Sequence, residues 1–293
     1  MSIHTQLKGT GVAIVTPFSK NGSVDFAGLS KLINHLMKGK AEYLVVLGTT
    51  GETATLTKKE KEQVIAHVIK ATKKRVPLVL GIGGNNTQEV IDTIKHTDLS
   101  AFAAILSVSP YYNKPSQRGI YEHYKAIAKS TKKPIILYNV PGRTASNITA
   151  ETTLKLAHNF KNIVAIKEAS GNIEQCMTII NNKPKDFLLI SGDDNLTLPL
   201  LACGASGVIS VLANAFPKEF SDMVRAGLDG DFKTARIIHY LCFEITNQLF
   251  ADGNPGGVKV ALELLGICKP TLRLPLVEPN DEVRKQLKAL IKG

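Results

Sequence analysis

The sequence predicts a (β/α)8 TIM barrel followed by a C-terminal helical extension, on three observations. Eight short apolar runs, rich in β-branched residues, alternate with longer amphipathic segments along the chain. The apolar runs are continuous rather than alternately polar, which is expected of parallel strands that are covered on both faces. All eight units are complete by about residue 230, a length that suits a TIM barrel, in which chemistry takes place at the C-terminal ends of the strands.

Each strand is expected at one apolar run. In chain order the runs are GVAIVTP at 11–17, EYLVVLG at 42–48, PLVLGIG at 77–83, AAILSVSP at 103–110, PIILYNVP at 134–141, NIVAIKEAS at 162–170, DFLLISGDD at 186–194 and SGVISV at 206–211. The helices after the first four strands are expected at 25–38, 57–72, 87–97 and 116–130. Thr57 with Glu60, and Asn86 with Glu89, have capping-box spacing, which predicts helix starts just after the second and third strands.

After about Gly230 the strand pattern stops, and the rest of the chain is expected to be helical, at 231–251, 255–266 and 280–291. The chain therefore divides into a catalytic barrel at 1–230 and a C-terminal helical domain at 231–293. NPGG at 254–257 is expected to be a turn that leads into a helix.

An open, doubly wound sheet is the competing arrangement. Against it, GIGG at 81–84 follows the third strand rather than the first and does not spell GxGxxG. A dinucleotide site therefore has little support, and no cofactor is expected.

The composition excludes several classes of protein. The 293 residues carry a formal net charge of +11, but the basic residues are scattered in short groups, so nucleic acid is not an expected partner. The first ten residues lack the apolar region of a signal peptide, and no run approaches the roughly 20 apolar residues of a membrane helix. A soluble, cytoplasmic protein is expected. The 4 cysteines form no CxxC pair and are expected to be reduced thiols.

Lys167 ends the sixth apolar run, where an ammonium group taken out of water is costly unless it is paired or loses its proton. Burial in a barrel is expected to leave a useful fraction of this side chain as free amine, which can attack a carbonyl carbon. The alternative is a structural lysine whose stem packs in the barrel while its head pairs with Glu168 or Asp193. Both interpretations are open at this point.

Tyr138 ends the fifth strand, beside the expected strand of Lys167. Adjacent strands lie about 4.8 Å apart, so a phenol and an amine at matching heights can reach one substrate atom. A tyrosine near a cation can pass protons during imine formation, which needs both a proton acceptor and a donor. The alternative is a core tyrosine whose hydroxyl is satisfied by a neighbour.

Further polar residues follow other expected strand ends. LGTTGET at 47–53 supplies backbone N–H groups and the hydroxyls of Thr49 and Thr50, which can together hold a small carboxylate, although a turn chosen for its shape is as good an interpretation. Arg143 follows the fifth strand and suits bidentate capture of a carboxylate, but an exposed loop arginine usually does nothing specific.

Two more groups lie at the expected mouth of the barrel. Tyr111 and Tyr112 follow the fourth strand and can cap the site or cross into another subunit, with an unspecific aromatic patch as the alternative. Gly192, Asp193 and Asp194 resemble a metal-ligand segment, yet no histidine or third carboxylate accompanies them nearby. No metal is therefore expected.

Six motifs together resemble those of the dihydrodipicolinate synthase family, within the pyruvate-dependent class I aldolases related to N-acetylneuraminate lyase. The motifs are GTTGE at 48–52, SPYYNKP at 109–115, LYNVPGRT at 137–144, IKEASGN at 166–172, SGDD at 191–194 and GVISV at 207–211. They occur in order over nearly the whole chain. Six motifs in register are far more specific than any one of them.

The resemblance implies condensation of pyruvate with L-aspartate-4-semialdehyde to give 4-hydroxy-tetrahydrodipicolinate, the first committed step of lysine biosynthesis through diaminopimelate. It implies that Lys167 forms a Schiff base with pyruvate, after which loss of a methyl proton gives an enamine that attacks the semialdehyde. A protonated imine is an electron sink, so the neighbouring carbanion is stabilised without a metal. A homotetramer built from tight dimers is also implied.

The resemblance also implies roles for the site residues. Tyr138 is the central proton-transfer residue, with Thr49 and Tyr112 as its relay partners, and Tyr112 is donated across a subunit interface. The implied substrate-binding residues are Thr50 with its adjacent N–H groups for the pyruvate carboxylate, Arg143 for the semialdehyde carboxylate, Ile209 through a backbone carbonyl near the lysine, and Gly192 of the SGDD motif.

One departure from the family concerns feedback by lysine. Asn85, Glu89 and Tyr111 match residues that can hold lysine as an effector at a dimer interface. Lys58 and Lys61 stand where feedback-sensitive members often have histidines. Two ammonium groups beside a cationic ligand oppose its binding by roughly several tenths to a few kcal/mol. The sequence therefore predicts weak or absent inhibition by lysine.

Two rival functions remain. A sister Schiff-base aldolase would cleave a sugar acid such as N-acetylneuraminate or 2-keto-3-deoxygluconate, but Arg143 within PGRT favours the shorter substrate, because a polyol needs room and hydroxyl partners at that position. A non-catalytic barrel that binds a keto acid is the other rival. Against it, Lys167, Tyr138, Thr49 and Arg143 occur together, and an inactive relative is expected to have lost at least one.

Overall fold

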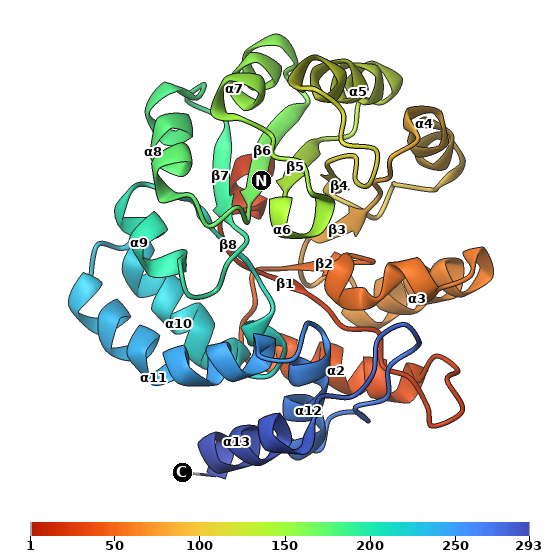
Figure 1. The fold of residues 1–293 in the computed structure, drawn as a ribbon, viewed down its shortest axis with the longest axis vertical. Coiled ribbons are helices and arrows are strands. Elements are labelled where there is room, and N and C mark those ends of the chain that lie inside the picture. The colour runs from red at the N-terminus through yellow and green to blue at the C-terminus, as the bar shows by residue number, and fades with distance from the viewer. Residues whose placement is uncertain (1, 293) are drawn as a thin grey trace.

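The computed structural model describes residues 2–292 and contains the predicted TIM barrel (Figure 1). Eight parallel strands close on themselves in the order β1 to β8. They are β1 (Gly9–Ala13), β2 (Tyr43–Val46), β3 (Leu78–Gly81), β4 (Ala104–Val108), β5 (Ile135–Asn139), β6 (Ile163–Glu168), β7 (Leu188–Ser191) and β8 (Gly207–Ser210). Each lies within or beside one of the predicted apolar runs, and β1 begins two residues earlier than expected because Gly9 pairs with Gly207 of β8.

A layer of helices surrounds the strands (Figure 1). Its members are α2 (Phe26–Lys38), α3 (Lys58–Thr72), α4 (Thr87–His96), α5 (Gln117–Ser130), α7 (Ala150–Asn159), α8 (Ile173–Asn182), α9 (Thr197–Ala202) and α10 (Pro217–Leu228). The predicted capping box of α3 is complete, because the Thr57 hydroxyl accepts from the Glu60 N–H and the Glu60 carboxylate accepts from the Thr57 N–H. At α4 only half of the predicted box forms: Asn86 caps the helix by accepting from Gln88 and Glu89 N–H groups.

Shorter elements lie at the two ends of the barrel. At the strand C-termini these are η1 (Thr49–Gly51), η2 (Thr53–Thr55), α6 (Pro141–Thr144) and η3 (Leu212–Asn214). The short helix α1 (Ile3–Gln6) precedes β1, and Leu7 after it packs with the side chains inside the barrel.

Three helices follow the barrel, as the end of the strand pattern predicted. They are α11 (Phe232–Phe250), α12 (Gly256–Leu264) and α13 (Asp281–Lys292), and they lie together on one side of the barrel, drawn in blue in Figure 1. No helix within residues 2–292 combines the length and the apolarity needed to cross a bilayer.

The core consists of two apolar clusters, one on each side of the strands. The larger cluster joins the outward side chains of the strands to the helices, and the smaller one fills the inside of the barrel. Alternation along β5 assigns Ile136 and Tyr138 to the inner cluster and Leu137 to the outer one. The same alternation on β6 puts Ala165 inside and Ile166 outside, so Lys167 points inward.

His123 on α5 gives a testable pH dependence of stability. Its Nδ1 lies 2.9 Å from the Thr87 hydroxyl, and its ring packs edge-on against Tyr124. Burial lowers the pKa of His123 from 6.5 to about 4, so the folded protein holds the neutral ring. The associated stability is complete above pH 6.5 and is lost as the pH falls towards 4.

We therefore expect the free energy of unfolding to decrease by about 3 kcal/mol more in the wild type than in His123→Asn between pH 7 and pH 4. Asparagine does not titrate in this range but can still meet Thr87. Urea unfolding at a series of pH values measures the difference. Parallel pH profiles for the two proteins would contradict the assignment.

Candidate active site

Lys167 and Tyr138 stand side by side at the C-terminal ends of β6 and β5. They are direct partners in the register of the two strands, and both side chains point into the barrel. The Lys167 side chain is almost wholly buried, with 5% of the residue exposed, and Tyr138 is 7% exposed. The Lys167 Nζ lies 4.3 Å from the centroid of the Tyr138 ring. An amine and a phenol therefore share one small space at the end of the barrel where TIM-barrel chemistry takes place.

The alternative in which Lys167 pairs with a carboxylate is not seen. No ion pair among residues 2–292 includes Lys167. Glu168 points to the outer side of the sheet, where its carboxylate accepts from the Asn139 and Gln175 amides and from the Ser170 N–H. Asp193 accepts from backbone N–H groups of its own loop. The lysine is thus buried without a permanent anionic partner.

Gly192 makes room for the lysine. A Cβ at this position would lie 2.9 Å from Lys167 Cε and 2.7 Å from Ala169 Cβ, both closer than real Cβ contacts. Any larger residue at 192 would therefore push the lysine stem out of its place. This is a steric role beside Lys167, and the sequence motif alone did not indicate it.

The turn after β2 carries Thr49 and Thr50 on η1. Thr50 is buried and Thr49 is exposed. Two non-glycine residues with left-handed backbone flank this turn, Leu47 at φ 57° and Glu52 at φ 52°. The first N–H groups of a helical turn lack acceptors within that turn, so this segment presents both hydroxyls and N–H groups, as a carboxylate site requires.

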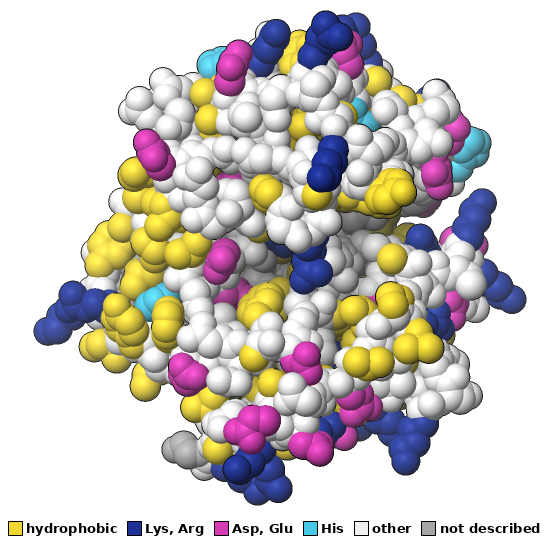
Figure 2. Space-filling model, viewed as in Figure 1, with side chains coloured by type: hydrophobic (Ala, Val, Ile, Leu, Met, Phe, Trp, Pro, Cys, Tyr) yellow, Lys and Arg dark blue, Asp and Glu magenta, His cyan; other side chains and the backbone are white. Residues whose placement is uncertain are grey.

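Arg143 and Tyr112 lie at the mouth rather than inside. Arg143 is on α6 and its side chain is exposed. Figure 2 shows a hollow near the centre of this face, beside the place where Figure 1 draws α6. Tyr112 is 88% exposed and has a left-handed backbone at φ 71°, and its neighbour Tyr111 is 41% exposed. Within one subunit, the Tyr112 side chain is therefore exposed to solvent and does not pack beside Tyr138.

Ile209 lies on the inner face of β8, and Asp194 holds the turn after that strand. The buried Asp194 carboxylate accepts from the Val211 and Leu212 N–H groups at 3.1 and 3.0 Å. Burial raises the pKa of Asp194, and hydrogen bonds from Ser210 and from the two backbone groups oppose that shift. Asp194 is thus a structural support for the strand that carries Ile209. Within residues 2–292, no three His, Cys, Asp or Glu side chains are grouped as metal ligands would be.

The residues expected at an effector site are distributed over three segments. Asn85 and Tyr111 come together, because the Asn85 amide donates to the Tyr111 carbonyl at 3.1 Å. Glu89 is on the first turn of α4, and Lys58 and Lys61 are on the first turn of α3. The structure gives no hydrogen bond or ion pair that joins the two lysines to Asn85 or Glu89 within the described chain.

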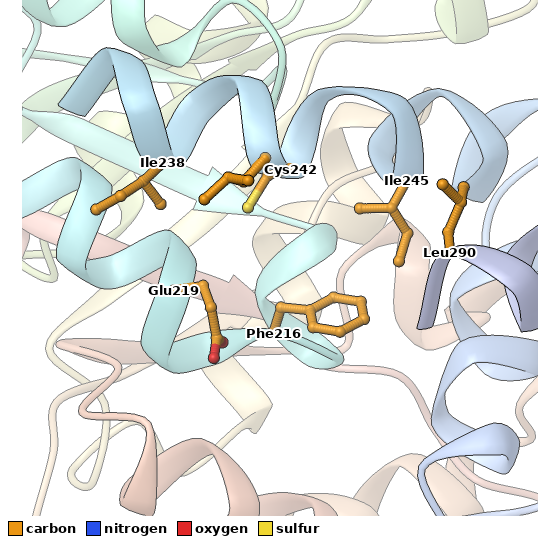
Figure 3. Close-up of a pocket in the computed structure, with 7 residues that line it drawn as sticks. Phe216, Glu219, Ile238, Cys242, Ile245 and Leu290 are labelled. Atoms are coloured by element: carbon orange, nitrogen blue, oxygen red, sulfur yellow. The ribbon is translucent and has the colours of Figure 1, made fainter. Parts of the chain in front are cut away.

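An apolar hollow of about 160 Å³ lies elsewhere, between α10, α11 and α13. Phe216, Ile238, Ile245 and Leu290 line it, and Glu219 is its single charged side chain (Figure 3). None of the predicted site residues borders it. It therefore belongs to the outer helix layer and not to the barrel mouth.

The chain is similar to known proteins over nearly its whole length. Residues 6–293 match the model of the dihydrodipicolinate synthetase family. A 4-hydroxy-tetrahydrodipicolinate synthase of Flavobacterium psychrophilum is 55% identical over 279 residues, which are 95% of each chain. The crystal structure of dihydrodipicolinate synthase from Aquifex aeolicus superposes with a TM-score of 0.94 at 42% identity, covering 98% of this chain and 97% of that one.

A monomeric dihydrodipicolinate synthase variant is also similar. It superposes with a TM-score of 0.95 at 36% identity and covers 99% of this chain and 97% of its own. The subunit fold is therefore shared between proteins that need not have the same oligomeric state.

Proposed function

The chain belongs to the dihydrodipicolinate synthetase family, and from that premise we infer that it condenses pyruvate with L-aspartate-4-semialdehyde to give 4-hydroxy-tetrahydrodipicolinate in lysine biosynthesis. The observation that carries the mechanism is Lys167, an amine buried inside the barrel without an anionic partner and in contact with the ring of Tyr138.

Lys167 is the proposed nucleophile. Its free amine attacks C2 of pyruvate, a C–N bond forms, and the keto oxygen leaves as water to give an imine. The protonated imine draws electrons from the methyl carbon, which loses a proton and becomes an enamine. The enamine carbon then attacks the aldehyde carbon of the second substrate. Hydrolytic or intramolecular release of the nitrogen restores the free lysine.

Tyr138 is the proposed proton-transfer residue of these steps. Dehydration of the carbinolamine needs a proton delivered to its leaving oxygen. Tyr138 lies beside Lys167 Nζ, the atom to which the carbinolamine carbon would be bonded. Thr49 and Tyr112 are proposed to connect Tyr138 to solvent. The exposure of Tyr112 in a single subunit supports its contribution to a neighbouring subunit's site.

The remaining roles concern substrate placement. Thr50 with the N–H groups of its turn is proposed to bind the pyruvate carboxylate, and the exposed Arg143 guanidinium to bind the semialdehyde carboxylate. Ile209 is proposed to accept a hydrogen bond through its carbonyl near the lysine. Gly192 is proposed to border the substrate, and its lack of a side chain leaves space for Lys167 Cε.

Assays with two substrate types test this function against its nearest rival, a sister aldolase. We expect turnover of pyruvate with L-aspartate-4-semialdehyde and no cleavage of N-acetylneuraminate or 2-keto-3-deoxygluconate. Cleavage of a sugar acid without turnover of the semialdehyde would reverse the assignment. We also propose that the protein is cytoplasmic and that its domain boundary lies at residue 230.

A homotetramer is the proposed assembly. Besides the Tyr112 loop, α11 exposes a second apolar surface, in which Ile237, Tyr240 and Leu241 are 57%, 66% and 76% exposed. Figure 2 shows hydrophobic side chains gathered on the left of this face, where Figure 1 places α8, α9 and α11. Contiguous apolar patches of this kind mark protein contacts.

We expect sedimentation velocity to give a tetramer, and Tyr240→Glu with Leu241→Glu to give a dimer. A wild type that is monomeric and fully active would contradict the proposal.

Inhibition by lysine is expected to be weak or absent. Lys58 and Lys61 add two positive charges at the first turn of α3, and these charges oppose a cationic effector. Initial rates at increasing lysine concentration measure the effect, and Lys58→His with Lys61→His is expected to be more sensitive than the wild type. Half inhibition of the wild type at sub-millimolar lysine would show the prediction to be wrong.

A further inference from the structure

The turn that carries Thr49 and Thr50 is held mainly from the far end of the chain. Its left-handed residues Leu47 and Glu52 are each costly, by about 1 kcal/mol or more, and such backbone persists only where the surroundings fix it. Hydrogen bonds to Thr50 and Glu52 come from Asn254, Lys259 and Arg273, about 200 positions later in the sequence. Within the barrel itself, the Thr16 hydroxyl adds one bond, to the Gly51 carbonyl at 2.7 Å.

The strongest of these contacts is a buried ion pair. The Lys259 ammonium on α12 donates to the Glu52 carboxylate, and both side chains are 0% exposed. The other Glu52 oxygen accepts from the Arg273 N–H at 3.2 Å. Lys259 also donates to the Thr271 carbonyl at 2.9 Å and lies 4.2 Å from the centroid of the Phe18 ring. The Lys259 ammonium is thus held by the Thr271 carbonyl and the Phe18 ring, and it joins Glu52 to the C-terminal segment.

A second contact acts directly on Thr50. The Asn254 amide, buried just before α12, donates to the Thr50 hydroxyl oxygen at 3.1 Å. A hydroxyl has one proton to give and accepts with its lone pairs. Because the Thr50 oxygen already accepts from Asn254, its own proton is free to point at another acceptor. That is the orientation a carboxylate ligand of Thr50 needs.

Stability alone does not explain the ion pair. Burying two charges costs free energy of desolvation that their attraction often fails to exceed, and apolar residues of similar size commonly do as well or better. Lys259 is also the single charged residue in the stretch from Gly256 to Leu262, in which every residue is buried. A buried ammonium group at this position of α12 is explained more directly if Lys259 fixes the position of the Glu52 carboxylate.

We propose that the Glu52–Lys259 ion pair and Asn254 are positioning residues for the pyruvate carboxylate, holding the turn of Thr49 and Thr50 in its binding conformation from the C-terminal helices. The proposal rests on the proposed function, in which Thr50 and its turn bind that carboxylate. It makes the C-terminal segment part of the pyruvate site, although none of the three residues is assigned a contact with substrate.

Two variants test the proposal. Glu52→Gln with Lys259→Met removes both charges at similar volume, so that no unpaired charge is left buried. Asn254→Asp replaces the amide donor by an acceptor. The Thr50 hydroxyl would then donate its hydrogen bond to this aspartate, which also adds a negative charge near the expected site of the pyruvate carboxylate. For each variant, borohydride trapping on Lys167 gives the pyruvate concentration at half saturation, steady-state rates give KM for both substrates, and thermal melting confirms folding.

We expect half-saturating pyruvate to rise at least about tenfold in both variants, which corresponds to about 1.4 kcal/mol of binding free energy, while KM for the semialdehyde changes less than about threefold. Glu122→Gln with Lys125→Met removes an ion pair on α5, and Asn159→Asp removes an amide donor to Tyr121, so these are matched controls that should leave both KM values unchanged. A general loss of stability would not separate the two substrates.

The outcomes are distinct. Unchanged pyruvate saturation in a folded variant, or equal increases of KM for both substrates, would overturn the positioning role. Should the double variant fail to fold, Asn254→Asp, which leaves the ion pair intact, decides the question. Absence of any pyruvate adduct in the wild type would instead refute the proposed chemistry, independently of the variants.

Discussion

Lys167→Ala is expected to reduce kcat by at least about 10³-fold, because it removes the amine proposed to form the covalent bond to pyruvate on which the later steps depend. The side chain is buried at the end of β6 and points into the barrel. Removing it should leave the proposed carboxylate site in the turn after β2 in place, but no imine can then form at residue 167 to act as the electron sink. Turnover measured with both substrates at saturation gives the size of the loss.

A matched control separates this effect from a general loss of positive charge. Lys161→Ala removes a lysine in the loop before the same strand, and it is expected to leave kcat within about twofold. Thermal melting of both variants checks that each is folded. Residual turnover above a few per cent in a folded Lys167→Ala protein would exclude the imine mechanism.

Tyr138→Phe is expected to lower kcat by a factor of order 10² or more while pyruvate still binds. The ring remains to pack against the lysine, so only the phenolic hydroxyl is lost. Because proton transfer is needed both to form the imine and to generate the enamine, the rate of trapping with borohydride should fall together with kcat. Pyruvate saturation should stay close to that of the wild type.

Tyr121→Phe is the control for this change. Its hydroxyl accepts a bond from the Asn159 amide, between α5 and the end of α7 in the outer helix layer. We expect the variant to keep wild-type kcat. A Tyr138→Phe protein with activity within about threefold of the wild type would remove Tyr138 from proton transfer and leave it as a packing residue.

The pairing of Lys167 with Tyr138 was predictable from the sequence. Both residues end apolar runs of consecutive units, and consecutive strands of a TIM barrel are neighbours, so their side chains had to meet if they fell on the same side of the sheet. The cap at Thr57 was also predictable, because a capping box is a local pattern of four residues. Features that depend on period and on near neighbours could be predicted from the order of residues.

The supports of the site could not be predicted in the same way. The contact of Asn254 with Thr50 joins residues 204 positions apart, and that of Lys259 with Glu52 joins residues 207 positions apart. Such contacts depend on how the last helices pack against the barrel, which no local pattern encodes. One signal was present: a lone lysine in the apolar run GGVKVAL requires a buried partner. The partner's identity needed the fold.

The steric role of Gly192 was hidden for a related reason. The SGDD motif marks a turn, but only the position of Lys167 Cε beside it shows that a side chain there has no room. Similarly, the sequence left open a pairing of Lys167 with Glu168. Alternation along β6 sends Glu168 to the outer side, where amides and a backbone N–H satisfy it. Both results follow from the direction of side chains in the closed barrel.

Borohydride reduction of the wild-type protein with pyruvate, followed by peptide mass mapping, tests the central claim most directly. We expect one stable adduct, with the mass of a reduced pyruvate imine, on the peptide that contains Lys167, and we expect no adduct when pyruvate is omitted. No adduct, or an adduct confined to a different lysine, would contradict the account of this barrel as a Schiff-base enzyme that uses Lys167.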